Sequence, residues 1–267
     1  MSSKVITATR LGFLEQARRP LLLILLVGLP FFFITRAIAS TVPQPRIVPL
    51  ADGAQVLSNM QDVHGATMAA ITVAFLAGLC GVFIMQSARD ADRRLIVAGF
   101  TGAQAIIPRL LQIAAATGVV VTVSLSVTAI SFQPEHWLPF AVATCLIGLT
   151  YGAIGALAGA LLGRLGATYF MLFLPMLDLG IAQTPMFGDG APDGWTQLLP
   201  GYGAGRVLVD AAFAPSFSAS AELAVAAAWA LAAAVAVTVL LGRALGLRGL
   251  PRGTRGPRRR TGVVGSP

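Results

Sequence analysis

The sequence predicts an all-α membrane protein with six transmembrane helices, and three observations lead to this fold class. The chain contains six long apolar runs, only 11% of its residues are charged, and its mean hydropathy is +0.78. The runs cover residues 20–39, 67–87, 110–131, 139–163, 168–187 and 221–245. A helix rises about 1.5 Å per residue, so each run is long enough to cross a hydrocarbon core of about 30 Å.

The positive charges are divided unequally between the segments that connect the runs. Alternate connections lie on opposite faces of a membrane, and 16 of the 19 Lys and Arg residues fall on the face that holds both termini. The other face has only Arg36, Arg46 and Arg206. By the positive-inside rule, both termini and residues 88–109 are expected in the cytoplasm. This asymmetry next to an anionic leaflet explains the net charge of +8 without a nucleic-acid partner.

Residues 1–19 are predicted to form an interfacial amphipathic helix. Apolar residues recur there at helical spacing, with Lys4, Arg10, Arg18 and Arg19 as cationic anchors. A disordered basic tail is the alternative interpretation. The first apolar run could also be a cleaved signal peptide, but Arg36 interrupts its end, and we interpret the run as an uncleaved span.

The transmembrane domain is predicted to cover residues 20–247, with long outer loops at 40–66 and 188–220. Pro43, Pro45 and Pro49 favour extended structure in the first of these loops. The second contains Trp195, Val207 and other apolar residues, which predict short helices folded back on the outer membrane surface. The Arg-, Gly- and Pro-rich residues 248–267 are expected to be a disordered cytoplasmic tail.

Small residues recur every four positions in the fourth span. They form two ladders, which include Gly148, Gly152, Gly155, Gly159 and Gly163. Small residues at this spacing let helix backbones approach closely in lipid, where packing replaces the hydrophobic effect as the driving force. The pattern therefore predicts a helix–helix interface, either within the chain or between chains.

No motif for enzymatic chemistry is found in the chain. A P-loop needs a Gly-Lys pair, and the only lysine is Lys4. His64 and His136 lie in different outer loops, while Cys80 and Cys145 lie within spans, so neither a metal site nor a disulfide framework is expected. We predict no catalytic residue, bound cofactor or enzymatic activity.

Asp178 is the acidic residue closest to the middle of a predicted span. A charge at that depth costs about 2.5–3.5 kcal/mol on insertion scales, so the side chain must be protonated, paired, or in contact with water or another helix. It could contact a substrate or carry a proton. Alternatively, it could form hydrogen bonds at a helix break, since Pro175 and Pro185 each remove a backbone donor nearby.

The connection between the second and third spans, residues 88–109, has an unusual pattern for a loop. Arg93 and Arg94 are followed by a short apolar helix that includes Leu95 and Ile96, then by a turn at residues 99–102 and a second helix. These apolar residues must lie in the membrane interface or fill a groove on a partner protein. A hairpin that only anchors the chain to the membrane is the simpler alternative.

This layout resembles the permease subunits of type-two ABC exporters. The resemblance is carried by the stretch Asp92-Arg93-Arg94-Leu95-Ile96-Val97-Ala98-Gly99-Phe100 and by Leu199-Pro200-Gly201-Tyr202-Gly203-Ala204-Gly205-Arg206. It implies that Arg93, Arg94, Leu95, Ile96, Gly99 and Phe100 belong to a coupling helix that docks on a separate ATPase subunit. It also implies export across a bacterial cytoplasmic membrane, a second permease copy or paralogue, and ATP and Mg²⁺ bound by the partner ATPase.

Two other functional classes fit parts of the sequence. A proton-coupled secondary transporter would use Asp178 as its protonation site. A membrane anchor or assembly protein would have no transport activity. A neighbouring gene that encodes a P-loop ATPase would favour the exporter over both.

Overall fold

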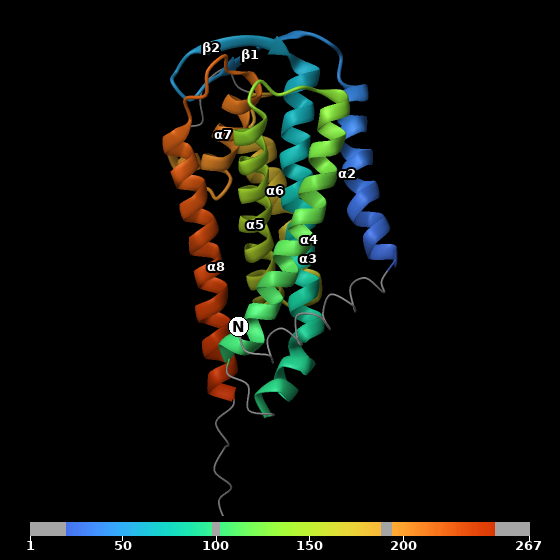
Figure 1. Cartoon of the computed structure of the whole chain (residues 1–267), viewed down its shortest axis with the longest axis vertical. Coiled ribbons are helices and arrows are strands. Elements are labelled where there is room, and N and C mark those ends of the chain that lie inside the picture. Colours follow the sequence, from blue (N-terminus) through green and yellow to red (C-terminus); the bar gives the residue numbers. More distant parts are fainter. Residues whose placement is uncertain (1–19, 98–101, 188–193, 249–267) are drawn as a thin grey trace, which may run out of the picture.

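The computed structural model describes residues 20–97, 102–187 and 194–248, which form a bundle of long helices with a small β-hairpin across one end (Figure 1). The long helices are α2 (Pro20–Ser40), α3 (Met60–Val97), α4 (Gly102–Ser131), α5 (Trp137–Leu161), α6 (Gly163–Leu177) and α8 (Ser220–Arg248). The shorter elements are β1 (Pro45–Pro49), β2 (Gln55–Asn59), the π-turn η1 (Asp178–Ala182), the 3-10 helix η2 (Gly194–Leu198) and α7 (Tyr202–Phe213).

The prediction of an all-α membrane protein is confirmed. Five of the described helical segments are long and apolar enough to cross a membrane. The described apolar part of α2, Ile24–Ser40, is shorter than these five. The interfacial helix predicted for residues 1–19 lies outside the described residues, as does the predicted tail after Arg248.

Several helix boundaries differ from the prediction, two of them with consequences for the site. The second membrane helix does not end near Ser87, because α3 runs without interruption from Met60 to Val97. Residues 92–97 are therefore the end of a long helix and not a separate short helix. The fifth span begins at Gly163 instead of Thr168, because only Leu162 separates α5 from α6.

The first outer loop is shorter than predicted and contains a β-hairpin. Helix α2 continues to Ser40 and α3 begins at Met60, so the two antiparallel strands occupy most of the connection. Ile47 of β1 lies opposite Leu57 of β2. The turn between the strands contains Gly53 at φ 84°, a left-handed conformation that favours glycine.

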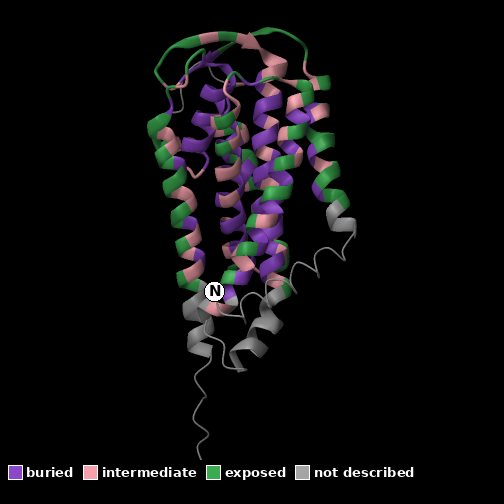
Figure 2. Ribbon diagram, in the orientation of Figure 1, coloured by how far each residue is buried: buried purple, intermediate pink, exposed green. Residues whose placement is uncertain are grey.

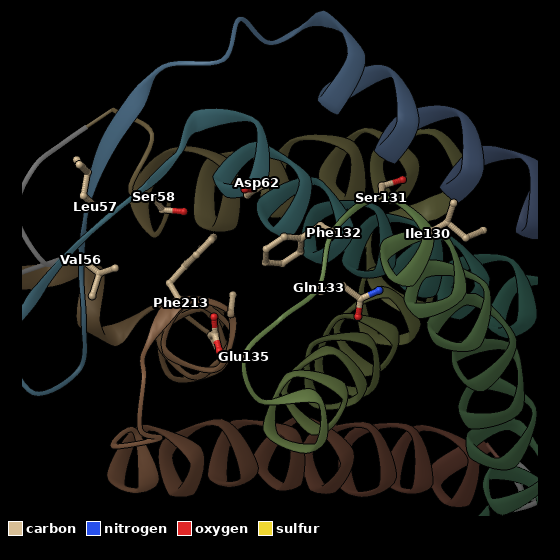
Figure 3. A pocket seen from close by; sticks show the side chains of 11 residues that line it. Val56, Leu57, Ser58, Asp62, Ile130, Ser131, Phe132, Gln133, Glu135 and Phe213 are labelled. Carbon is tan, nitrogen blue, oxygen red and sulfur yellow. The ribbon is translucent and has the colours of Figure 1, made fainter.

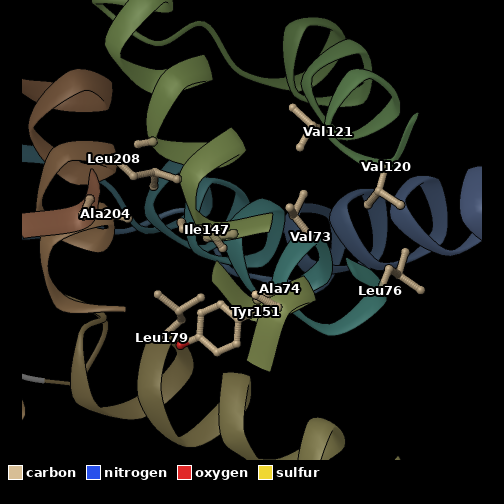
Figure 4. Packing of buried hydrophobic residues seen from close by; sticks show 14 of the residues in the cluster. Val73, Ala74, Leu76, Val120, Val121, Ile147, Tyr151, Leu179, Ala204 and Leu208 are labelled. Atoms are coloured by element: carbon tan, nitrogen blue, oxygen red, sulfur yellow. The ribbon is translucent and has the colours of Figure 1, made fainter. Parts of the chain in front are cut away.

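The centre of the bundle is a close contact between α3 and α5. A methyl group added at Gly155 would lie against the backbone of Gly78, 2.9 Å from its Cα. One added at Gly159 would lie 2.8 Å from the carbonyl oxygen of Val82. On the neighbouring face of α5, Gly148 and Gly152 lie against side chains of α4. The two ladders therefore lie at interfaces within the chain, and Figure 4 shows part of the surrounding apolar core.

Gly163 has a different role from the other glycines of the predicted ladder. A methyl group added there would meet no atom within 4 Å, so Gly163 does not belong to the packing interface. Its φ of 70° lets the chain turn directly from α5 into α6.

Helix α7 is buried, whereas the sequence pattern predicted helices on the outer membrane surface. Eleven of its residues, from Gly203 to Phe213, are buried. Its first turn contains Gly203, where an added methyl group would lie 2.6 Å from the carbonyl oxygen of Glu222 in α8. The small residues of this turn let α7 pack inside the bundle against α5 and α8 (Figures 1 and 2).

The glycine contact predicts opposite effects for the same substitution at two positions. Gly155→Ala should destabilise the protein by about 1–3 kcal/mol, because the added methyl group meets backbone that cannot move away easily. Gly118→Ala is the matched control, since a methyl group at Gly118 meets nothing within 4 Å. It should be neutral or stabilising by up to about 1 kcal/mol. Thermal unfolding of the purified proteins in detergent measures both effects, and equal melting temperatures would contradict the proposed packing.

Candidate functional site

The ends of α3 and α4, residues 88–97 and 102–109, form an extension that we call the arm. The apolar sequence of α3 ends at Ser87, and the helix continues for ten residues from Ala88 to Val97, five of which are charged. At about 1.5 Å per residue, this adds about 15 Å to the helix. In Figure 1 the lower ends of α3 and α4 extend below the end of α5, at the end of the molecule opposite the hairpin.

The arm contains most of the residues predicted to couple to a partner. The last five residues of α3, which ends at Val97, include Arg93, Arg94, Leu95 and Ile96. Gly99 and Phe100 lie outside the described residues. The basic and apolar residues of the predicted coupling segment that the structure describes therefore lie beyond the apolar sequence of α3.

A second candidate site surrounds Asp178, which is only 1% exposed. The Tyr151 hydroxyl of α5 donates a hydrogen bond to Asp178 Oδ2 at 2.5 Å, and the Gly201 amide donates to the same oxygen at 2.8 Å. Gln183 Nε2 donates to Asp178 Oδ1 at 3.3 Å. We call these four residues the Asp178 cluster. Figure 4 shows the Tyr151 ring extending from α5 toward Leu179, the neighbour of Asp178.

The Asp178 cluster lies at a change in helix type. Pro175 has no amide hydrogen to donate, and the helix widens into the π-turn η1 three residues later, where the Gln183 amide donates to the Asp178 carbonyl at 2.9 Å. Asp178 was predicted near the middle of its span. The structure instead places it in the last turns of the apolar segment Gly163–Ala182, because α6 begins earlier than predicted.

The Asp178 cluster joins three parts of the chain. Its members come from α5, from the end of α6 and from the turn before α7, and a methyl group at Gly201 would lie 2.7 Å from Asp178 Oδ1. Gln183 Nε2 also donates to the Thr196 carbonyl at 2.8 Å. Asp178 was interpreted either as a substrate- or proton-binding group or as a hydrogen-bonded residue at a helix break. This geometry matches the second interpretation.

Two further buried charged residues of α7 were not singled out from the sequence. Arg206 donates to the carbonyl oxygens of Pro49 and Leu50 at the end of β1. Asp210 is fully buried and accepts hydrogen bonds from the backbone amides of Ala51, Ser218 and Ala219. Together they join the hairpin, α7 and the start of α8. The sequence feature that could have identified them is their charge within a long apolar segment, because a buried charged residue needs polar partners.

A hollow of about 480 Å³ lies at the hairpin end of the bundle (Figure 3). It is lined by β2, by the beginning of α3, by the α4–α5 connection and by the end of α7. Asp62 and Glu135 give it two carboxylates, beside apolar residues such as Phe132 and Phe213. Asp178 does not line this hollow.

Within residues 20–97, 102–187 and 194–248, no three His, Cys, Asp or Glu side chains come together as a possible metal site. No family model, curated protein or solved structure matches the chain. The class that the described fold defines is that of an all-α, multi-pass membrane protein.

The Asp178 cluster predicts different effects for two tyrosine substitutions. Tyr151→Phe removes a donor from a buried carboxylate oxygen and should destabilise the protein by about 1–3 kcal/mol. Tyr169→Phe removes the same hydroxyl from a side chain of α6 that is 60% exposed, so it should change stability little. Thermal unfolding in detergent compares the two variants. If both have the wild-type melting temperature, the cluster does not hold these segments together.

Proposed function

We propose that this protein is the membrane-spanning permease subunit of an ATP-driven exporter of the type-two ABC class. It would cross the membrane six times, with α2 as the first span and both termini in the cytoplasm of a bacterial cell. It would bind no ATP itself and would couple to a separate ATPase subunit, which binds ATP and Mg²⁺. The observation that carries this proposal is the arm.

The arm supports the proposal through its position and its composition. It continues beyond the apolar sequence of α3, on the side that the charge distribution assigns to the cytoplasm. The sequence there combines Arg93 and Arg94 with Leu95 and Ile96, and Phe100 follows between the two segments of the arm. Apolar and aromatic residues at the centre of an interface, with charged residues at its rim, are typical of protein–protein contacts.

The exposed apolar faces of the bundle support pairing with a second permease copy or a paralogue. Only 28% of the most apolar part of Gly163–Ala182 is buried within the chain. Its exposed side chains include Tyr169, Phe173, Met176 and Leu177. In a membrane these residues contact lipid or another helix, and two copies in contact along α2 and α6 would enclose a path between them.

The environment of Asp178 favours the exporter over a proton-coupled transporter. A proton-carrying group must exchange its proton with water on each side of the membrane. Asp178 is 1% exposed and has three hydrogen-bond donors around it, two of which come from other segments of the chain. These contacts support a structural role for this carboxyl group.

Photo-crosslinking from the arm and from Phe100, between its two segments, tests the proposed ATPase contact. A photoreactive amino acid at Leu95 or at Phe100 should capture a chain that contains a P-loop, identified by mass spectrometry after irradiation of intact cells. The same amino acid at Leu57 is the matched control. Leu57 is 70% exposed but lies on the hairpin at the other end of the molecule, so it should capture no ATPase.

Phe100→Ala should lower the affinity for the ATPase about thirty-fold, since removing an aromatic side chain at the centre of an interface costs about 2 kcal/mol or more. Co-purification and substrate-stimulated ATP hydrolysis measure this loss, while insertion of the chain should be unchanged. If the arm crosslinks only to lipid, it is a membrane anchor and the exporter proposal fails.

A further inference from the structure

A groove of about 720 Å³ lies between α2 and α3, close to the start of α6. Leu76 and Cys80 of α3 are buried at its base, whereas Leu25 of α2 is 43% exposed at its edge. The α3 residues that line it extend from Leu76 to Ser87, which corresponds to about 16 Å along the helix. The groove is therefore elongated along α3 and mostly apolar.

The polar groups of the groove gather at one end. Gln86, Ser87 and Arg164 are its polar lining residues, and all three lie at the end of the groove nearest the arm. The Arg164 guanidinium carbon lies 5.8 Å from the centre of the Phe83 ring, which holds the cation over the groove wall. Among the described residues, no carboxylate is paired with Arg164.

Gln86 provides a second, independent indication of a ligand at this end. Its Nε2 atom is buried and has no hydrogen-bond partner among the described residues. A buried amide without a partner is unfavourable, so a ligand that accepts its hydrogen bond would be stabilised at this position. Gln86 and Arg164 line the same end of the groove, and each carries hydrogen-bond donors suited to an anionic group.

We propose that this groove binds an anionic phospholipid of the surrounding leaflet, with its phosphate at Arg164 and Gln86 and one acyl chain along Leu79 and Leu29. The apolar walls match the chain, and the donors at one end match the headgroup. A helix of a second copy would fill the apolar length but would leave the Gln86 amide without an acceptor. The inference depends on the membrane location of the chain and not on the proposed ATPase coupling.

Spin-labelled lipids in vesicles of phosphatidylcholine test the proposal with the purified full-length protein. The measured quantity is the preference of the protein for labelled phosphatidylglycerol over labelled phosphatidylcholine. The wild type should prefer phosphatidylglycerol. Arg164→Gln should reduce that preference about fivefold, the effect of one cation near the membrane surface. Arg36→Gln is the matched control, because Arg36 is exposed near the other end of α2 and its loss should leave the preference unchanged.

Two further variants keep the test decisive if Arg164→Gln fails to fold. Gln86→Met retains the size of the side chain but removes the donor, and should also lower the preference. Leu79→Trp fills the groove, and should reduce the immobilised fraction of both lipids. Stearic acid and inorganic phosphate are added as competitors to distinguish a phospholipid site from a site for a free fatty acid or a free phosphate. A phospholipid site should resist displacement by phosphate alone.

Three results would overturn the inference. The first is a wild-type protein with no preference for phosphatidylglycerol. The second is a preference that folded Arg164→Gln and Gln86→Met variants both retain. The third is efficient disulfide formation between two copies through Leu79→Cys in a background without Cys80 and Cys145, because the groove would then be an interface between copies. None of these results bears on capture of an ATPase by the arm.

Discussion

The backbone contact between α3 and α5 is the constraint on which the rest of the bundle depends. In lipid, apolar side chains gain little by leaving one apolar environment for another, so helices associate through close packing. The glycines of α5 allow this packing because the backbones of Gly78 and Val82 occupy the space where side chains would otherwise lie. Helix α3 is thereby fixed at the centre, in contact with α2, α4, α5 and α6. Its continuation past Ser87 then determines where the arm lies.

The two ends of the bundle are stabilised by different interactions. At the hairpin end, Asp178, Arg206 and Asp210 are buried, and their partners are largely backbone groups from distant parts of the chain. These hydrogen bonds hold the hairpin, the π-turn, α7 and the start of α8 together. At the other end, the described structure has the arm and an apolar groove with hydrogen-bond donors at the end nearest the arm. We expect the first end to be the more rigid one, with partner and lipid contacts concentrated at the second.

The sequence predicts features that repeat along one helix better than contacts between distant segments. The two ladders, one with Gly148 and Gly152 and the other with Gly155 and Gly159, are visible because each step is four residues. The apolar runs are visible because a span needs length. The partners of Asp178 could not be predicted in the same way, since Tyr151 and Gly201 are 27 and 23 residues away. Arg206 reaches Pro49, 157 residues earlier. The burial of α7 and the uninterrupted α3 depend on packing and on the absence of a helix breaker, which hydropathy alone does not reveal.

Cysteine accessibility across the membrane tests the central claim most directly, namely that the hairpin and the arm lie on opposite sides of the cytoplasmic membrane. A single cysteine replaces Ala54 in the hairpin or Arg255 after α8, in a chain without Cys80 and Cys145. A membrane-impermeant maleimide should label Ala54→Cys in intact cells and Arg255→Cys only after lysis, because the excess of positive charge predicts that both termini lie inside. Labelling of Arg255→Cys but not of Ala54→Cys in intact cells would contradict the account, since the arm could not then reach a cytoplasmic ATPase.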